Sequence, residues 1–231
     1  MTMPIARRAL SSLPRAGLAV AALSVSLLAA CSSKPPVPEW QMNAHGSAQK
    51  AIEAYLSGDT RVADLEWSRA RAEVARTGRP DRLARLELMR CAAQVASLDA
   101  QPCAAFEALR ADAPPTDPAY ADYLAGRAAA AAAVALLPPP QRAAATDTAA
   151  VAGIADPLSR LVAAGAAVQA GRATAELAVL ATDTASDQGW RRPLLAWLLL
   201  RAQSADQAGD AVQAAALRKR IELVERQGAP R

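Results

Sequence analysis

The sequence is poor in the residues that most active sites need. It contains one histidine (His45), one phenylalanine and three cysteines, and aromatic residues make up only 3% of the chain. Metal sites and catalytic sites need clusters of histidine, cysteine or carboxylate side chains. The chain also lacks a Gly-rich phosphate loop and the HExxH and GxSxG motifs. We therefore predict that it is not an enzyme and that it binds no metal, cofactor or small-molecule substrate.

Acidic residues are absent from the first 30 positions, where Arg7, Arg8 and Arg15 precede an apolar stretch. This order is typical of a secretory signal peptide, and the apolar stretch is shorter than the roughly 20 residues of a membrane span. We predict that residues 1–30 are this signal. The whole chain carries a net charge of +4, and removing three arginines with the signal leaves +1. The main argument for nucleic-acid binding would be an excess of positive charge, and a net charge of +1 does not supply one.

The apolar stretch ends in Leu28-Ala29-Ala30-Cys31, which resembles the lipobox of bacterial lipoproteins. In that family the signal is cleaved before the cysteine, which becomes a lipid-bearing N-terminus. The resemblance implies a diacylglyceryl thioether and an N-acyl chain on Cys31, and several chains are needed for stable anchoring. With Ser32 after the cysteine, it also implies anchoring at the periplasmic face of the outer membrane. The alternative is an ordinary cleaved signal that ends near a cysteine.

Residues 31–43 are predicted to be the lipidated cysteine and a tether. Their prolines lack an amide donor and bias the preceding residue towards extended backbone, so we expect a stiff spacer without helix. Residues 44–231 are predicted to form a single domain, because a mature chain of about 200 residues can bury a sizeable core.

Strand signals are absent from this domain. Good helix formers dominate it, and Gly and Pro cluster at regular breaks. The pattern predicts an all-α fold of about five antiparallel helical hairpins, with boundaries good to a few residues. The expected pairs are 44–57 with 61–77, 81–97 with 100–111, 118–136 with 141–151, 157–170 with 173–183, and 190–207 with 210–227.

The first and last hairpins share one spacing of small and apolar residues. The two sets are Ala51, Gly58, Ala63, Trp67, Ala70 and Ala202, Gly209, Ala214, Arg218, Ile221. Small side chains let helices approach closely, Gly ends the first helix, and an Asp caps the next. This spacing resembles the tetratricopeptide repeat (TPR), which implies a right-handed α-solenoid. The early Trp, the Gly-Tyr pair and the closing Pro of that repeat are mostly missing, and generic helical hairpins are the alternative.

Cys91 and Cys103 are the cysteines that remain beside the lipid anchor. The periplasm is oxidising, so an even number of cysteines favours a disulfide. The two residues lie six positions either side of Ser97, and a chain reversal there would bring them together across a hairpin. We predict this disulfide; two buried free cysteines are the alternative.

TPR-like lipoproteins of the outer membrane act as adaptors in envelope assemblies, and the resemblance implies the same role here. We therefore expect a lipid-anchored periplasmic scaffold that binds another envelope protein. A purely structural lipoprotein that self-associates is the alternative. Trp and Tyr are enriched at binding hot spots, and core packing is the alternative interpretation of each candidate. The candidate contact residues are Trp40, Tyr55, Tyr120 and Tyr123.

Overall fold

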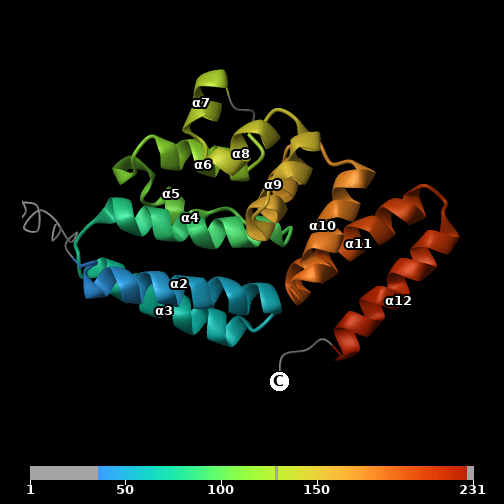
Figure 1. Ribbon diagram of the computed structural model, residues 1–231, viewed down its shortest axis with the longest axis horizontal. Helices are drawn as coiled ribbons and strands as arrows, with labels where there is room; N and C mark the ends of the chain where they lie inside the picture. The colour runs from blue at the N-terminus through green and yellow to red at the C-terminus, as the bar shows by residue number, and fades with distance from the viewer. Residues whose placement is uncertain (1–35, 128–129, 228–231) are drawn as a thin grey trace, which may run out of the picture. The chain divides into compact units, whose positions relative to one another are not determined.

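The computed structural model describes residues 36–127 and 130–227, and every regular element in these two ranges is helical (Figure 1). The all-α prediction is confirmed for this part of the chain. The predicted signal and Cys31 lie outside the described residues. Residues 38–231 form a unit of their own, and the helices below belong to it.

Seven long helices make up most of the unit, and shorter pieces lie between the third and the fourth. The long ones are α2 (Glu39–Ser57), α3 (Thr60–Ala75), α4 (Pro80–Ala96), α9 (Pro157–Gln169), α10 (Ala175–Asp187), α11 (Arg191–Gln207) and α12 (Ala211–Gln227). The short ones are α5 (Ala104–Glu107), η2 (Arg110–Asp112), α6 (Thr116–Leu124), α7 (Ala131–Leu136), α8 (Pro139–Ala144) and η3 (Thr148–Gly153).

The turns between α2 and α3 and between α11 and α12 use the chemistry that the shared spacing predicts. Gly58 has a φ of 95°, and the Asp59 side chain accepts a hydrogen bond from the amide of Val62 at 3.0 Å. In the second turn the Asp210 side chain accepts from the amide of Gln213 at 2.9 Å. Each Asp satisfies an amide that the first helical turn leaves without a partner.

The tether prediction needs one correction, because helix α2 begins at Glu39 and includes the last five residues of 31–43. Pro38 stands at the N-cap with a φ of −55°, and proline is tolerated where a helix starts because no amide is needed there. The acidic Glu39 in the first turn also complements the helix dipole. Trp40 is therefore a helical residue.

The middle of the chain also differs from the prediction, since 100–111, 118–136 and 141–151 do not form long helices. Leu98 turns the chain with a φ of 56°, and the next helix after α4 begins only at Ala104. The Asp99 side chain accepts from the amide of Gln101, at 3.3 Å, within a turn. The prolines at 114–115 and 138–140 divide the remainder into short pieces.

Helix α4 lies between the α2–α3 pair and α9 (Figure 1) and contacts all three. Gly165 of α9 lies directly against the backbone of Val95 in α4. In a solenoid each repeat contacts only its neighbours, whereas here α2 also packs against α11. The contacts of the described helices thus extend beyond nearest-neighbour stacking.

Candidate functional site

The structure joins Cys91, in α4, to Cys103, just before α5, by a disulfide with a Cα–Cα distance of 5.7 Å. Cys91 is buried and Cys103 is half-buried. The predicted pair is therefore present. The second cysteine lies in the loop before a single-turn helix, and not in the long helix that we expected.

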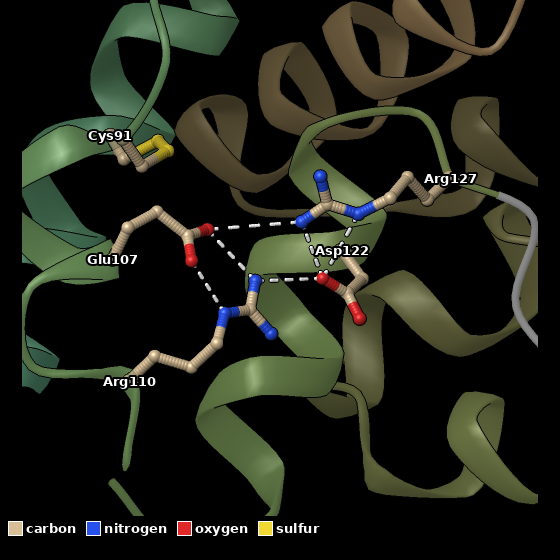
Figure 2. Close-up of polar contacts among 6 residues, drawn as sticks. Cys91, Glu107, Arg110, Asp122 and Arg127 are labelled. Atoms are coloured by element: carbon tan, nitrogen blue, oxygen red, sulfur yellow. Dashed lines mark hydrogen bonds and ion pairs between the residues drawn. A yellow bond between two sulfur atoms is a disulfide. The ribbon is translucent and has the colours of Figure 1, made fainter. Parts of the chain in front are cut away.

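A network of four charged side chains lies beside the disulfide (Figure 2). Arg110 Nε donates to Glu107 Oε2 at 2.6 Å, and Arg110 Nη2 donates to Asp122 Oδ1 at 2.8 Å. Arg127 Nε donates to the same Asp122 oxygen at 3.0 Å. The hydrogen bond from Arg110 lowers the pKa of Glu107. Desolvation opposes the same shift at Asp122, but hydrogen bonds from both arginines still lower its pKa.

The cavity beside this network measures about 460 Å³. Its charged groups already pair with one another, so no group there needs a ligand. The network instead fastens the loop that follows the disulfide to helix α6.

Two of the aromatic candidates, Trp40 and Tyr55, are half-buried and covered by arginine side chains. The Arg82 guanidinium lies 5.3 Å from the centre of the Trp40 ring, and Arg192 lies 4.3 Å from that of Tyr55. Tyr55 also donates to Asp99 Oδ2 at 3.4 Å. Burial and the nearby Asp99 raise the pKa of Tyr55 to about 12. These contacts within the chain are enough to explain the positions of both rings, so neither ring requires a binding partner.

Tyr123 is only 5% exposed, so its side chain has little surface to offer a partner. Its hydroxyl donates to Gln141 Oε1 at 2.9 Å, and Gln141 Nε2 donates to the carbonyl oxygen of Ser159 at 3.0 Å. This chain of hydrogen bonds ties α6 to α8 and α9. The Tyr123 ring also stacks on Tyr120, with the centroids 6.2 Å apart.

Tyr120 lines a pocket of about 420 Å³ between α4, α6 and the junction of α7 with α8. Leucine, methionine and proline side chains form the apolar part of its wall, and a carboxylate, a phenol, a threonine hydroxyl and two guanidinium groups supply its polar part. We name it the Asp117 pocket. Its lining includes Arg85, Leu88, Met89, Asp117, Tyr120, Leu136 and Arg142.

Asp117 is 4% exposed and stands in the first turn of α6, where the helix dipole favours a negative charge. Its Oδ1 accepts from Arg85 Nη2 at 2.8 Å and from Thr116 Oγ1 at 3.0 Å. The hydrogen bond to Asp117 raises the pKa of Arg85. Its Oδ2 is buried and has no hydrogen-bond partner among the described residues. A buried acceptor without a donor costs about 1–3 kcal/mol.

Asp117 was not among the site residues predicted from the sequence. In "ADAPPTDP" it stands between prolines, where an acidic residue is an ordinary feature of a turn or a helix start. Its burial depends on α4 and on the α7–α8 junction, which are distant in sequence. No local pattern signals such a residue.

Residues 36–127 and 130–227 contain no group of three His, Cys, Asp or Glu side chains placed to hold a metal ion. His45 is exposed on α2. No helix within these ranges has the length and apolar character that crossing a membrane requires.

No protein-family model, curated protein or solved structure matches this chain. The features that bear on its function are the lipobox-like sequence before Cys31, the disulfide and the Asp117 pocket.

Proposed function

We propose that the chain is a lipid-anchored scaffold at the periplasmic face of the outer membrane and that it binds another envelope protein through the Asp117 pocket. The observation that carries the binding role is the buried Asp117 oxygen without a donor. A buried acceptor without a donor is destabilising in the free protein. In a binding site, the partner supplies the missing donor.

Two features support export and anchoring. The first is the lipobox ending at Cys31, with Ser32 after it. The second is the Cys91–Cys103 disulfide, since disulfides persist in oxidising compartments such as the periplasm and are rare in the cytosol.

The role of a scaffold is supported by the helix pairs α2–α3 and α11–α12, which keep the TPR-like spacing and turn chemistry. The hydrogen bonds from Tyr123 through Gln141 to Ser159 also hold α6, α8 and α9 together next to the pocket. Such a pre-organised wall lowers the entropic cost of binding. A TPR-like repeat scaffold is the architecture we propose for these pairs.

Co-purification from detergent-solubilised envelope tests this function, with the tagged full-length protein and two variants. Leu136→Trp places a bulky side chain at the Asp117 pocket, where Leu136 is 40% exposed. Val212→Trp adds the same side chain on α12, where Val212 is 83% exposed. We expect one heterologous protein to accompany the wild type and Val212→Trp, and to be lost with Leu136→Trp.

Two results would contradict the proposal. Self-association alone, measured by analytical ultracentrifugation, would identify a structural lipoprotein without a specific partner. Equal capture by both tryptophan variants would place the contact surface away from the Asp117 pocket.

A further inference from the structure

The charges and hydrogen-bonding groups of the Asp117 pocket restrict what it can hold. We infer that it takes a tryptophan side chain of the partner protein, whose indole N–H donates to Asp117 Oδ2. The inference rests on the proposed function and specifies the group that the partner inserts.

The wall of the pocket calls for a largely apolar occupant. Leu88 and Met89 of α4 face it from one side, and Leu136 borders it at the end of α7. Its volume of about 420 Å³ lies within the range of pockets that bury most of a small organic group. A large, rigid aromatic side chain gains the most from burial there, as the anchor residues of protein interfaces do.

The occupant also has to be neutral. Asp117 Oδ1 already pairs with Arg85 at 2.8 Å, and Arg142 contributes a second guanidinium to the lining. A lysine or arginine side chain would face these two cations while finding a carboxylate whose charge is already compensated. Like-charge contacts of this kind disfavour a partner.

The remaining requirement is a donor, because Asp117 Oδ2 can only accept. The indole N–H of tryptophan is a donor without an acceptor, whereas a tyrosine hydroxyl is also an acceptor that would need a donor of its own in the pocket. Guanidinium groups stack favourably on aromatic faces, and tryptophan is the best of these. Tryptophan thus meets the three requirements: an apolar body, no charge and a single donor.

Binding requires Oδ2 to reach the pocket surface, since the atom is closed to solvent in the described structure. The χ2 torsion of aspartate is soft and broadly distributed, and the turn that the inference requires exposes Oδ2 while Oδ1 keeps Arg85 and Thr116 as donors. Once paired, the oxygen no longer carries the penalty of a buried acceptor without a donor.

Small probes test the inference on the purified full-length protein by isothermal titration calorimetry. Indole has the N–H donor, and 1-methylindole has nearly the same shape without it. We expect indole to bind about tenfold more tightly, the effect of one hydrogen bond to a charged group. p-Cresol and n-butylammonium stand for tyrosine and lysine, and both should bind more weakly than indole.

Three variants locate the site of binding. Leu136→Trp should abolish the binding of both indoles. Asp117→Asn should remove the preference for indole, because the amide offers a donor where the carboxylate only accepts. Asp122→Asn is the matched control, since it removes a carboxylate from the same helix at a position outside the pocket, and it should bind like the wild type. Circular dichroism checks the fold of each variant.

Equal affinity for the two indoles, tighter binding of p-cresol or n-butylammonium, or indole binding that survives Leu136→Trp would overturn the inference. If Asp117→Asn does not fold, the comparison of the two indoles on the wild type still decides. The probes need no envelope protein, so the two proposals fail separately. If Leu136→Trp loses the partner but the wild type shows no preference for indole, only the proposal of a tryptophan occupant is overturned. If the wild type prefers indole but no partner co-purifies, the proposal of a scaffold that binds an envelope protein is overturned.

Discussion

The indole Nε1 of Trp197 donates a hydrogen bond to the carbonyl oxygen of Ala96, 3.1 Å away and 101 residues earlier in the chain. Trp197 is fully buried in α11, and Ala96 is the last residue of α4. Carbonyl groups in the last turn of a helix have no partner within the helix. The bond therefore satisfies an end of α4 and ties it to a helix near the other end of the chain.

Trp197→Phe should lower the free energy of unfolding by about 3 kcal/mol, because it removes this donor and leaves a cavity in the core. Urea denaturation followed by circular dichroism measures the loss. Trp40→Phe is the control, since Trp40 is half-buried under Arg82, and it should cost about 1 kcal/mol or less. Similar losses for the two variants would show that the long-range contact adds nothing.

How far the sequence predicts this structure depends on how local each feature is. The turns at Gly58–Asp59 and Gly209–Asp210 depend on glycine and aspartate within a few residues, and both were predicted. The bond from Trp197 to Ala96 depends on packing between distant helices, which no short pattern encodes.

The loop after α4 shows the same limit. Leu98 takes a left-handed conformation, with a φ of 56°, at a position where helices usually end in glycine. Its side chain is half-buried against the core, and we attribute its tolerance there to this packing. The sequence offers no glycine to mark the turn, so a second long helix was predicted just beyond it. Asp117 escaped prediction for a related reason, because its burial depends on α4.

The close approach of α9 to α4 predicts opposite effects for two glycine substitutions. A Cβ on Gly165 would lie 2.8 Å from the carbonyl carbon of Val95 and still closer to its oxygen. Because backbone cannot move aside cheaply, Gly165→Ala should destabilise the protein by about 2 kcal/mol. Gly46, in α2, has no atom within 4 Å of such a Cβ, and Gly46→Ala should stabilise by about 0.5–1 kcal/mol. Thermal unfolding of both variants shows whether each substitution stabilises or destabilises the protein. An unchanged stability for Gly165→Ala would contradict this close packing.

Removal of the disulfide should lower stability without changing the helix content. Cys91 and Cys103 are 12 residues apart. Closing a loop of that length lowers the conformational entropy of the unfolded chain and so raises its free energy by about 3 kcal/mol. The double variant Cys91→Ala/Cys103→Ala should melt at a lower temperature. The wild type with reductant should behave like this variant, and the variant itself should not respond to reductant. An unchanged melting temperature would mean that the link contributes nothing in solution.

The ion pair between the half-exposed Arg71 and the buried Glu87 predicts that stability depends on pH. The Glu87 side chain is 3% exposed and that of Arg71 is 45% exposed. Burial raises the pKa of Glu87 although Arg71 opposes the shift. A carboxyl group whose pKa is higher in the folded state stabilises most at low pH, and this contribution is lost as the pH rises through the unfolded pKa towards the folded one.

Arg71→Ala should therefore destabilise the protein by about 2 kcal/mol at neutral pH, because the Glu87 charge loses its nearest compensation. The loss should shrink as the pH falls into the acidic range, where Glu87 protonates in the folded state, because its pKa is raised by burial. The double variant Arg71→Ala/Glu87→Gln is the control and should lose this extra pH dependence. Denaturant curves at several pH values make the comparison, and an Arg71→Ala penalty that is equal at all of them would rule out this role for Glu87.

The proposed anchor predicts the mass of the protein extracted from membranes. If Cys31 is the lipidated N-terminus, the intact mass should equal residues 31–231 plus a diacylglyceryl group and an acyl chain. Alkylation should label no thiol before reduction and two thiols after it, because only Cys91 and Cys103 remain. The variant Cys91→Ala/Cys103→Ala should keep the lipid and show no alkylation in either state. A mass without lipid would make Cys31 a third thiol and would remove the basis for an outer-membrane scaffold, while the Asp117 pocket would remain to be tested on a soluble protein.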